Sequence, residues 1–147
     1  MWEFIVRVLL GLFLMVVAIK DLISKKISLW IVILCIILLS ICIPFCKALT
    51  LLDRILGISL GLGVLILSKI TEGKIGMGDG LVLSVTGMGL GFWSNLELFA
   101  LALAFAALFS MFLLVFRLAG RKNSIPFLPF MFISYLFLCI PVWSEII

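Results

Sequence analysis

Long apolar stretches, separated by short segments that hold most of the charges, leave this chain few ways to fold. The stretches cover residues 4–19, 29–46, 56–67, 81–93, 96–116 and 125–142. A helix that crosses a bilayer needs about 20 apolar residues. The third stretch reaches that length if it begins at Leu51 and carries Asp53 and Arg54 as a neighbouring pair at the membrane interface. With 66% hydrophobic and 12% charged residues among 147, the chain is far more apolar than soluble domains. We therefore predict an all-α membrane protein with six transmembrane helices, forming one polytopic domain over residues 1–147.

The basic residues are divided unequally between the two ends of such a bundle. One end holds Lys20, Lys25, Lys26, Lys69, Lys74, Arg117, Arg121 and Lys122, and the other holds Arg7, Lys47 and Arg54. Because cytoplasmic loops near the ends of spans are rich in Lys and Arg, both termini are predicted to be extracytoplasmic. Asp21 then ends an inward helix and Asp79 begins an outward one, so both carboxyl groups are expected at the cytoplasmic face.

Asp79 stands directly behind Gly76 and Gly78 at the start of an apolar stretch. An ionisable residue at membrane depth is costly to desolvate and is a functional-site hypothesis by default, and Asp21 is its natural partner. Two carboxyl groups a few ångströms apart cannot both ionise readily, so one of them holds a proton near neutral pH. The ionised group can take a proton from water while the other polarises a peptide carbonyl, which amounts to hydrolysis without a covalent intermediate. Glycines lack Cβ and would let a substrate backbone approach this pair.

Other interpretations of these residues stay open on the residues alone. Both aspartates could cap helix ends, where the helix dipole favours a carboxylate at an N-terminus, or they could couple protons or ions to transport. Glu72 fits either a solvated loop charge or a substrate contact, and Pro126 and Pro129 could simply start the last helix. The chain has no histidine, which removes the commonest general base and most zinc sites. The four cysteines lie in apolar stretches without a Cys-x-x-Cys pair and fit small buried residues, so no metal or cofactor is predicted.

Three motifs in a fixed order carry a resemblance to a known family. They are Asp21 followed by Lys25-Lys26-Ile27, then Gly76-Met77-Gly78-Asp79 with Gly87 and Gly91 beyond it, then Ile125-Pro126-Phe127-Leu128-Pro129-Phe130. Over nearly its whole length the chain resembles the type IV prepilin peptidases, which are bacterial aspartic proteases of the membrane. The resemblance implies that Asp21 and Asp79 are the catalytic pair, and that the substrate is the short basic leader of a prepilin or pseudopilin. It also implies substrate-binding or site-shaping roles for Gly76, Gly78, Glu72, Lys74, Pro126 and Pro129.

The chain departs from the family pattern in three places. Ser28 and Leu29 stand where family members usually have proline and asparagine. Leu81 stands where they usually have a lysine, so Lys74 or Lys20 would have to take over any role of that lysine. Longer members carry a cytoplasmic insertion with paired cysteines, associated with N-methylation of the processed pilin, and the segment between the first two predicted helices is too short to hold it. The resemblance therefore implies proteolysis without N-methyl transfer.

The expected location is the bacterial cytoplasmic membrane, with the cut made on its cytoplasmic side. The expected partners are the lipid bilayer and a prepilin or pseudopilin of a type IV pilus or a related protein-secretion system, with no nucleic acid. The alternative function is that of a small proton-coupled membrane carrier or an assembly subunit, using the same carboxylates.

Overall fold

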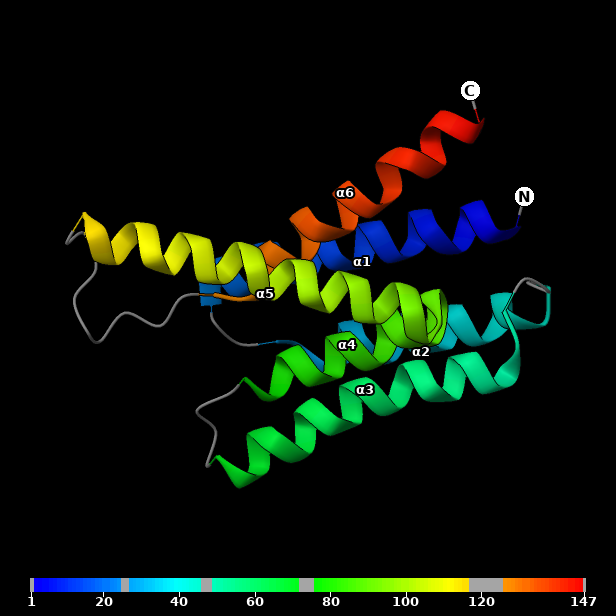
Figure 1. Cartoon of the computed structure of the whole chain (residues 1–147). Helices are drawn as coiled ribbons and strands as arrows, with labels where there is room; N and C mark the ends of the chain where they lie inside the picture. Colours follow the sequence, from blue (N-terminus) through cyan, green and yellow to red (C-terminus); the bar gives the residue numbers. More distant parts are fainter. Residues whose placement is uncertain (1, 25–26, 46–48, 72–75, 117–125, 147) are drawn as a thin grey trace.

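The computed structural model describes residues 2–24, 27–45, 49–71, 76–116 and 126–146, the last helix with its side chains up to residue 139. Every regular element in these ranges is helical, which confirms the predicted all-α class for the described part of the chain (Figure 1). The elements are α1 (Trp2–Ser24), α2 (Leu29–Cys42), the short 3₁₀ helix η1 (Ile43–Phe45), α3 (Leu51–Ile70), α4 (Met77–Leu90), α5 (Phe92–Val115) and α6 (Leu128–Ile146).

Three of these helices, α1, α3 and α5, are long and apolar enough to cross a membrane. The prediction of six spanning helices is therefore confirmed only for these three. The predicted extension of the third stretch is correct, because α3 begins at Leu51. The fourth predicted helix differs most from the prediction. The helix α4 has 14 residues and is about 21 Å long, whereas the hydrocarbon core of a bilayer is about 30 Å thick.

A single glycine sets the end of α4. Gly91 has a φ of 80°. It is both the C-cap residue of α4 and the N-cap residue of α5. A residue with a side chain adopts this backbone conformation only at a cost, which explains glycine at this position. The predicted apolar stretch 81–93 is therefore divided after Leu90, and α4 extends instead towards Met77.

The helices alternate in direction, so the bundle has two distinct ends (Figure 1). The beginning of α1 and the ends of α4 and α6 lie at one end, on the right in the figure. The ends of α1 and α3 and the beginnings of α2 and α4 lie at the other, on the left. Asp21, in the last turn of α1, and Asp79, in the first turn of α4, therefore share one end of the bundle.

The helix α4 is central, since it contacts α1, α2, α3 and α5. Its closest neighbour is α3, because glycines on both helices let the two backbones approach. A Cβ placed on Gly57 would meet the carbonyl oxygen of Gly87, and one placed on Gly61 would meet the hydroxyl of Ser84. Close packing of the same kind occurs at Gly89, where a Cβ would lie 2.6 Å from Leu10 Cδ1.

A buried polar group ties α5 to this pair. Asn95, which is fully buried, donates from Nδ2 to the carbonyl oxygens of Gly57 at 3.3 Å and Leu83 at 3.0 Å. The hydroxyl of Thr86 donates to Asn95 Oδ1 at 2.7 Å. These bonds join α3, α4 and α5 and hold the helix that carries Asp79. Our sequence analysis missed Asn95, although a lone amide in an apolar stretch is a signal for such a bond.

Candidate active site

Asp21 links the end of α1 to the beginning of α6. Its Oδ2 accepts a hydrogen bond of 3.4 Å from the backbone N–H of Leu128, which is the first residue of α6. The first N–H groups of a helix have no partner within the helix, and the helix dipole favours a carboxylate beside them. The half-buried carboxyl group of Asp21 thus fixes two elements that are far apart in the sequence.

The proline segment owes its position to the same contact. Pro126 precedes α6 and Pro129 is its second residue, positions at which the missing N–H of proline leaves no backbone bond unmade. The segment therefore both starts the helix and lies beside Asp21, because Leu128, between the two prolines, donates to this carboxylate.

Asp79 is held at the beginning of α4 by a tight local arrangement. Its backbone N–H donates to the carbonyl oxygen of Gly76 at 3.1 Å. Its carboxyl group lies over the same glycine, since a Cβ placed on Gly76 would be 2.8 Å from Asp79 Oδ2. Any larger residue at position 76 would thus compete with this orientation of the carboxyl group.

The two aspartates face each other electrostatically. The carboxyl group of Asp79 is close enough to that of Asp21 for the two to interact electrostatically. Their surroundings differ, because Asp21 accepts a bond from the first N–H of α6 and Asp79 lies over Gly76. Two coupled carboxyl groups in different surroundings can supply an acid and a base at one site.

The second glycine of the motif has a neighbour within the protein. A Cβ placed on Gly78 would meet Cδ1 of Ile27, the isoleucine of the first sequence motif. Packing against Ile27 thus accounts for Gly78 without any substrate. Gly76 is exposed, so of the two glycines it is the one whose backbone an incoming peptide could approach.

The structure describes only some of the other residues discussed for the site. Glu72 and Lys74 lie outside the described residues. Lys20 is exposed at the end of α1, next in sequence to Asp21. Leu81 packs against the hydrophobic core, so the position at which type IV prepilin peptidases usually have a lysine has a packing role in this chain.

Arg54, predicted as a neighbour of Asp53 at the membrane interface, is buried within the protein, with 4% of its surface exposed. Its Nη1 donates to the carbonyl oxygen of Met88 at 2.9 Å, near the end of α4. This guanidinium lies at the end of the bundle away from the two aspartates.

With this geometry established, we compared the chain with models of protein families, with curated proteins and with solved structures. None of the three comparisons finds a match.

Proposed function

We propose that this chain is a membrane aspartic endopeptidase that removes the short basic leader from type IV prepilin-like or pseudopilin substrates. The observation that carries the proposal is that Asp21 and Asp79 lie at the same end of the bundle and close enough to interact electrostatically. The resemblance of the three sequence motifs supports the same assignment. The proline segment adds to it, because α6 begins against Asp21.

The proposed reaction uses the pair with one proton between its two members. The ionised carboxylate takes a proton from a water molecule, whose oxygen attacks the carbonyl carbon of the scissile peptide. The protonated carboxyl group donates to the carbonyl oxygen as negative charge develops there. The carbon–nitrogen bond then breaks, and the leaving nitrogen receives a proton from the pair. No covalent intermediate forms, and the two carboxyl groups end the cycle with one proton between them, as they began it.

In the proposed topology all six helices lie in the membrane, with both termini outside the cytoplasm. The shorter α2, α4 and α6 pack against α1, α3 and α5, which are long enough to span alone. This orientation puts Asp21 and Asp79 at the cytoplasmic face of the bacterial inner membrane. A leader peptide that precedes a membrane-inserted hydrophobic helix would meet the site at this depth.

The topology can be tested by labelling. In a variant without its native cysteines, Asn123→Cys should react with a membrane-impermeant maleimide only when the cytoplasmic side is accessible. A tag placed after Ile147 should be reached only from the opposite side. The reason is the excess of basic residues at the end that carries the aspartates. The reverse labelling pattern would put the catalytic pair on the wrong face for a pilin leader.

The activity itself is tested by the mass of the product. Purified protein, incubated with a prepilin whose basic leader ends in glycine and with S-adenosylmethionine, should release a shortened pilin with an unmodified N-terminal amine. Mass spectrometry reads both the cleavage position and any added methyl group. An Asp79→Asn variant in the same membrane preparation is the control for contaminating proteases. An uncut substrate with the wild-type protein, together with proton uptake that depends on Asp79, would favour the carrier alternative.

A further inference from the structure

Both chain neighbours of Asp79 are glycines that lie against another part of the protein. A Cβ placed on Gly78 would meet Cδ1 of Ile27 and would lie 2.8 Å from its Cγ1. A Cβ placed on Gly80, which is buried, would lie 2.7 Å from Cγ of Leu65 on α3. Residues two apart in an α-helix differ by about 200° around its axis. The turn of α4 that carries Asp79 is therefore held between Ile27 on one side and Leu65 on nearly the opposite side.

The contact with Ile27 connects this turn with the other aspartate. Ile27 follows Asp21 in the short segment between α1 and α2, directly before Ser28, the N-cap residue of α2. Its side chain is partly buried and packs against the hydrophobic core, which fixes its position. Ile27 therefore lies where the segment that follows Asp21 meets the beginning of α4.

The size and stiffness of this side chain decide how closely the two segments approach. Cδ1 and Cγ1 of Ile27 occupy the space that a Cβ would take at position 78, so the backbone of Gly78 rests directly on them. A β-branched side chain has few rotamers open to it, and it therefore acts as a stiff spacer. The spacing between the segment after Asp21 and the first turn of α4 is thus set by one isoleucine.

We propose that Ile27 is a positioning residue that sets the separation of the carboxyl groups of Asp21 and Asp79. The inference rests on the proposed function, because hydrolysis by a pair that shares a proton requires both groups at a defined distance from the same water and peptide. A misplacement of about 1 Å can lower the rate of an enzyme about 10²-fold. An apolar side chain that touches neither substrate nor water can therefore control this chemistry.

The kinetics of leader removal test the role of Ile27. Ile27→Ala is expected to lower kcat by about 10- to 100-fold, through displacement of Asp79. KM should stay unchanged, because Ile27 holds the catalytic pair and not the leader. Ile27→Val removes only Cδ1, so it should have a smaller effect of the same kind, and it replaces the alanine variant if that variant fails to fold.

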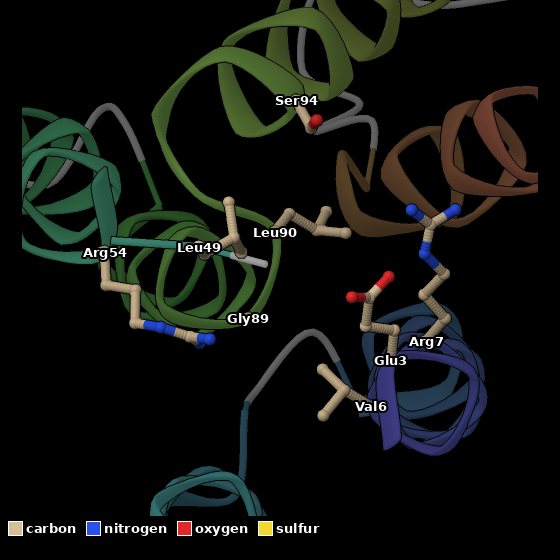
Figure 2. A pocket seen from close by; sticks show the side chains of 8 residues that line it. All are labelled: Glu3, Val6, Arg7, Leu49, Arg54, Gly89, Leu90 and Ser94. Carbon is tan, nitrogen blue, oxygen red and sulfur yellow. The ribbon is translucent and has the colours of Figure 1, made fainter. Parts of the chain in front are cut away.

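Two controls separate this role from a general loss of apolar surface. Ile23→Ala makes the same substitution at a residue of α1 that is 77% exposed. Ser94→Ala lies at the end of the bundle away from the aspartates, where Ser94 lines a cavity of about 150 Å³ with residues of α1, α3 and α4 (Figure 2). Neither control should change kcat or KM.

An exchange of volume across the contact tests it directly. Gly78→Ala alone should lower kcat, because the added Cβ meets Ile27. Combined with Ile27→Ala, the same Cβ has Cβ of residue 27 as its neighbour at 3.4 Å, which is close to the optimum for two carbon atoms. The double variant should therefore be more active than either single variant. Gly80→Ala should gain nothing from Ile27→Ala, since its Cβ would lie 3.0 Å from the backbone nitrogen of Leu65.

Cross-linking measures the separation of the pair without any substrate. In a full-length variant without native cysteines, Asp21→Cys and Asp79→Cys are joined by bismaleimides of increasing span. The shortest reagent that joins the two introduced cysteines is found first. Ile27→Ala should lower the yield with this reagent and raise it with longer ones, because the beginning of α4 loses its spacer. Ile23→Ala and Ser94→Ala should leave both yields unchanged.

The two kinds of measurement distinguish this inference from the proposed function. If the wild-type protein cuts no prepilin but cross-linking depends on Ile27, the peptidase assignment is wrong and Ile27 still sets the separation of the pair. If Ile27→Ala lowers thermal stability and leaves kcat and cross-linking as in the wild type, Ile27 is only a packing residue and the inference is overturned. A double variant no more active than Gly78→Ala would also overturn it.

Discussion

Replacement of Asp21 or Asp79 by asparagine is expected to lower prepilin cleavage by about 10²–10⁴-fold, the range that positioned proton transfer contributes. Asparagine keeps the size of the side chain and an oxygen that can accept a hydrogen bond, but it cannot exchange a proton. At position 21 it can still accept the N–H of Leu128, so the beginning of α6 should stay in place. The measurement is the rate of leader removal in membranes, together with the amount of protein in the same membranes.

Alanine at the same positions separates catalysis from helix capping. Asp21→Ala removes both the charge and the acceptor for Leu128, and loss of a capping acceptor costs about 0.5–2 kcal/mol. We therefore expect Asp21→Ala to be as inactive as Asp21→Asn but less stable to heating in detergent. If Asp21→Asn cleaves the substrate at the wild-type rate, Asp21 is only a cap and the catalytic assignment is wrong.

The part of this site that the sequence predicts follows from topology and charge. Asp21 and Asp79 each stand at a boundary between an apolar stretch and a basic segment. When successive helices run in opposite directions, the end of the first helix and the beginning of the fourth lie at the same end of the bundle. This rule needs no knowledge of side-chain packing, and the observed arrangement agrees with it (Figure 1).

The parts that sequence reasoning missed depend on contacts between distant residues. Nothing around Gly78 in the sequence indicates that Ile27 will pack against it, or that Leu128 will donate to Asp21. The sequence also does not indicate that Arg54 is buried. Its Nη1 donates to the carbonyl oxygen of Met88, which is near the end of α4. That end is set in turn by the positive φ of Gly91.

The helix α4 connects the stability of the bundle with its proposed chemistry. Asp79 lies in its first turn, whereas the contacts that hold the helix lie further along, at Thr86 and Gly87. Because a helix is stiff along its axis, a change in the packing of Gly87 should be felt at Asp79. A substitution far from both aspartates can therefore reduce activity by displacing one of them.

Two glycines on α3 allow this coupling to be tested with matched substitutions. A Cβ on Gly57 would meet the carbonyl oxygen of Gly87 and lie 2.8 Å from its carbonyl carbon, and a backbone cannot yield as a flexible side chain can. Gly57→Ala should therefore separate α3 from α4 and stretch the bond from Asn95 to the carbonyl oxygen of Gly57. We expect it to lower the free energy of unfolding by about 1–3 kcal/mol, as overpacking typically does, and to reduce cleavage as well.

The control is Gly63→Ala on the same helix, where a Cβ would have no neighbour within 4 Å. Alanine in a helix interior is favoured over glycine by about 0.5–1 kcal/mol, so this variant should be as stable as the wild type or slightly more so. It should also cleave prepilin at the wild-type rate. Thermal unfolding in detergent and leader removal in membranes are measured for both variants. Equal stability of the two would mean that α3 and α4 do not approach at Gly57 and Gly87. A Gly57→Ala variant that is destabilised yet fully active would instead show that Asp79 is held independently of this contact.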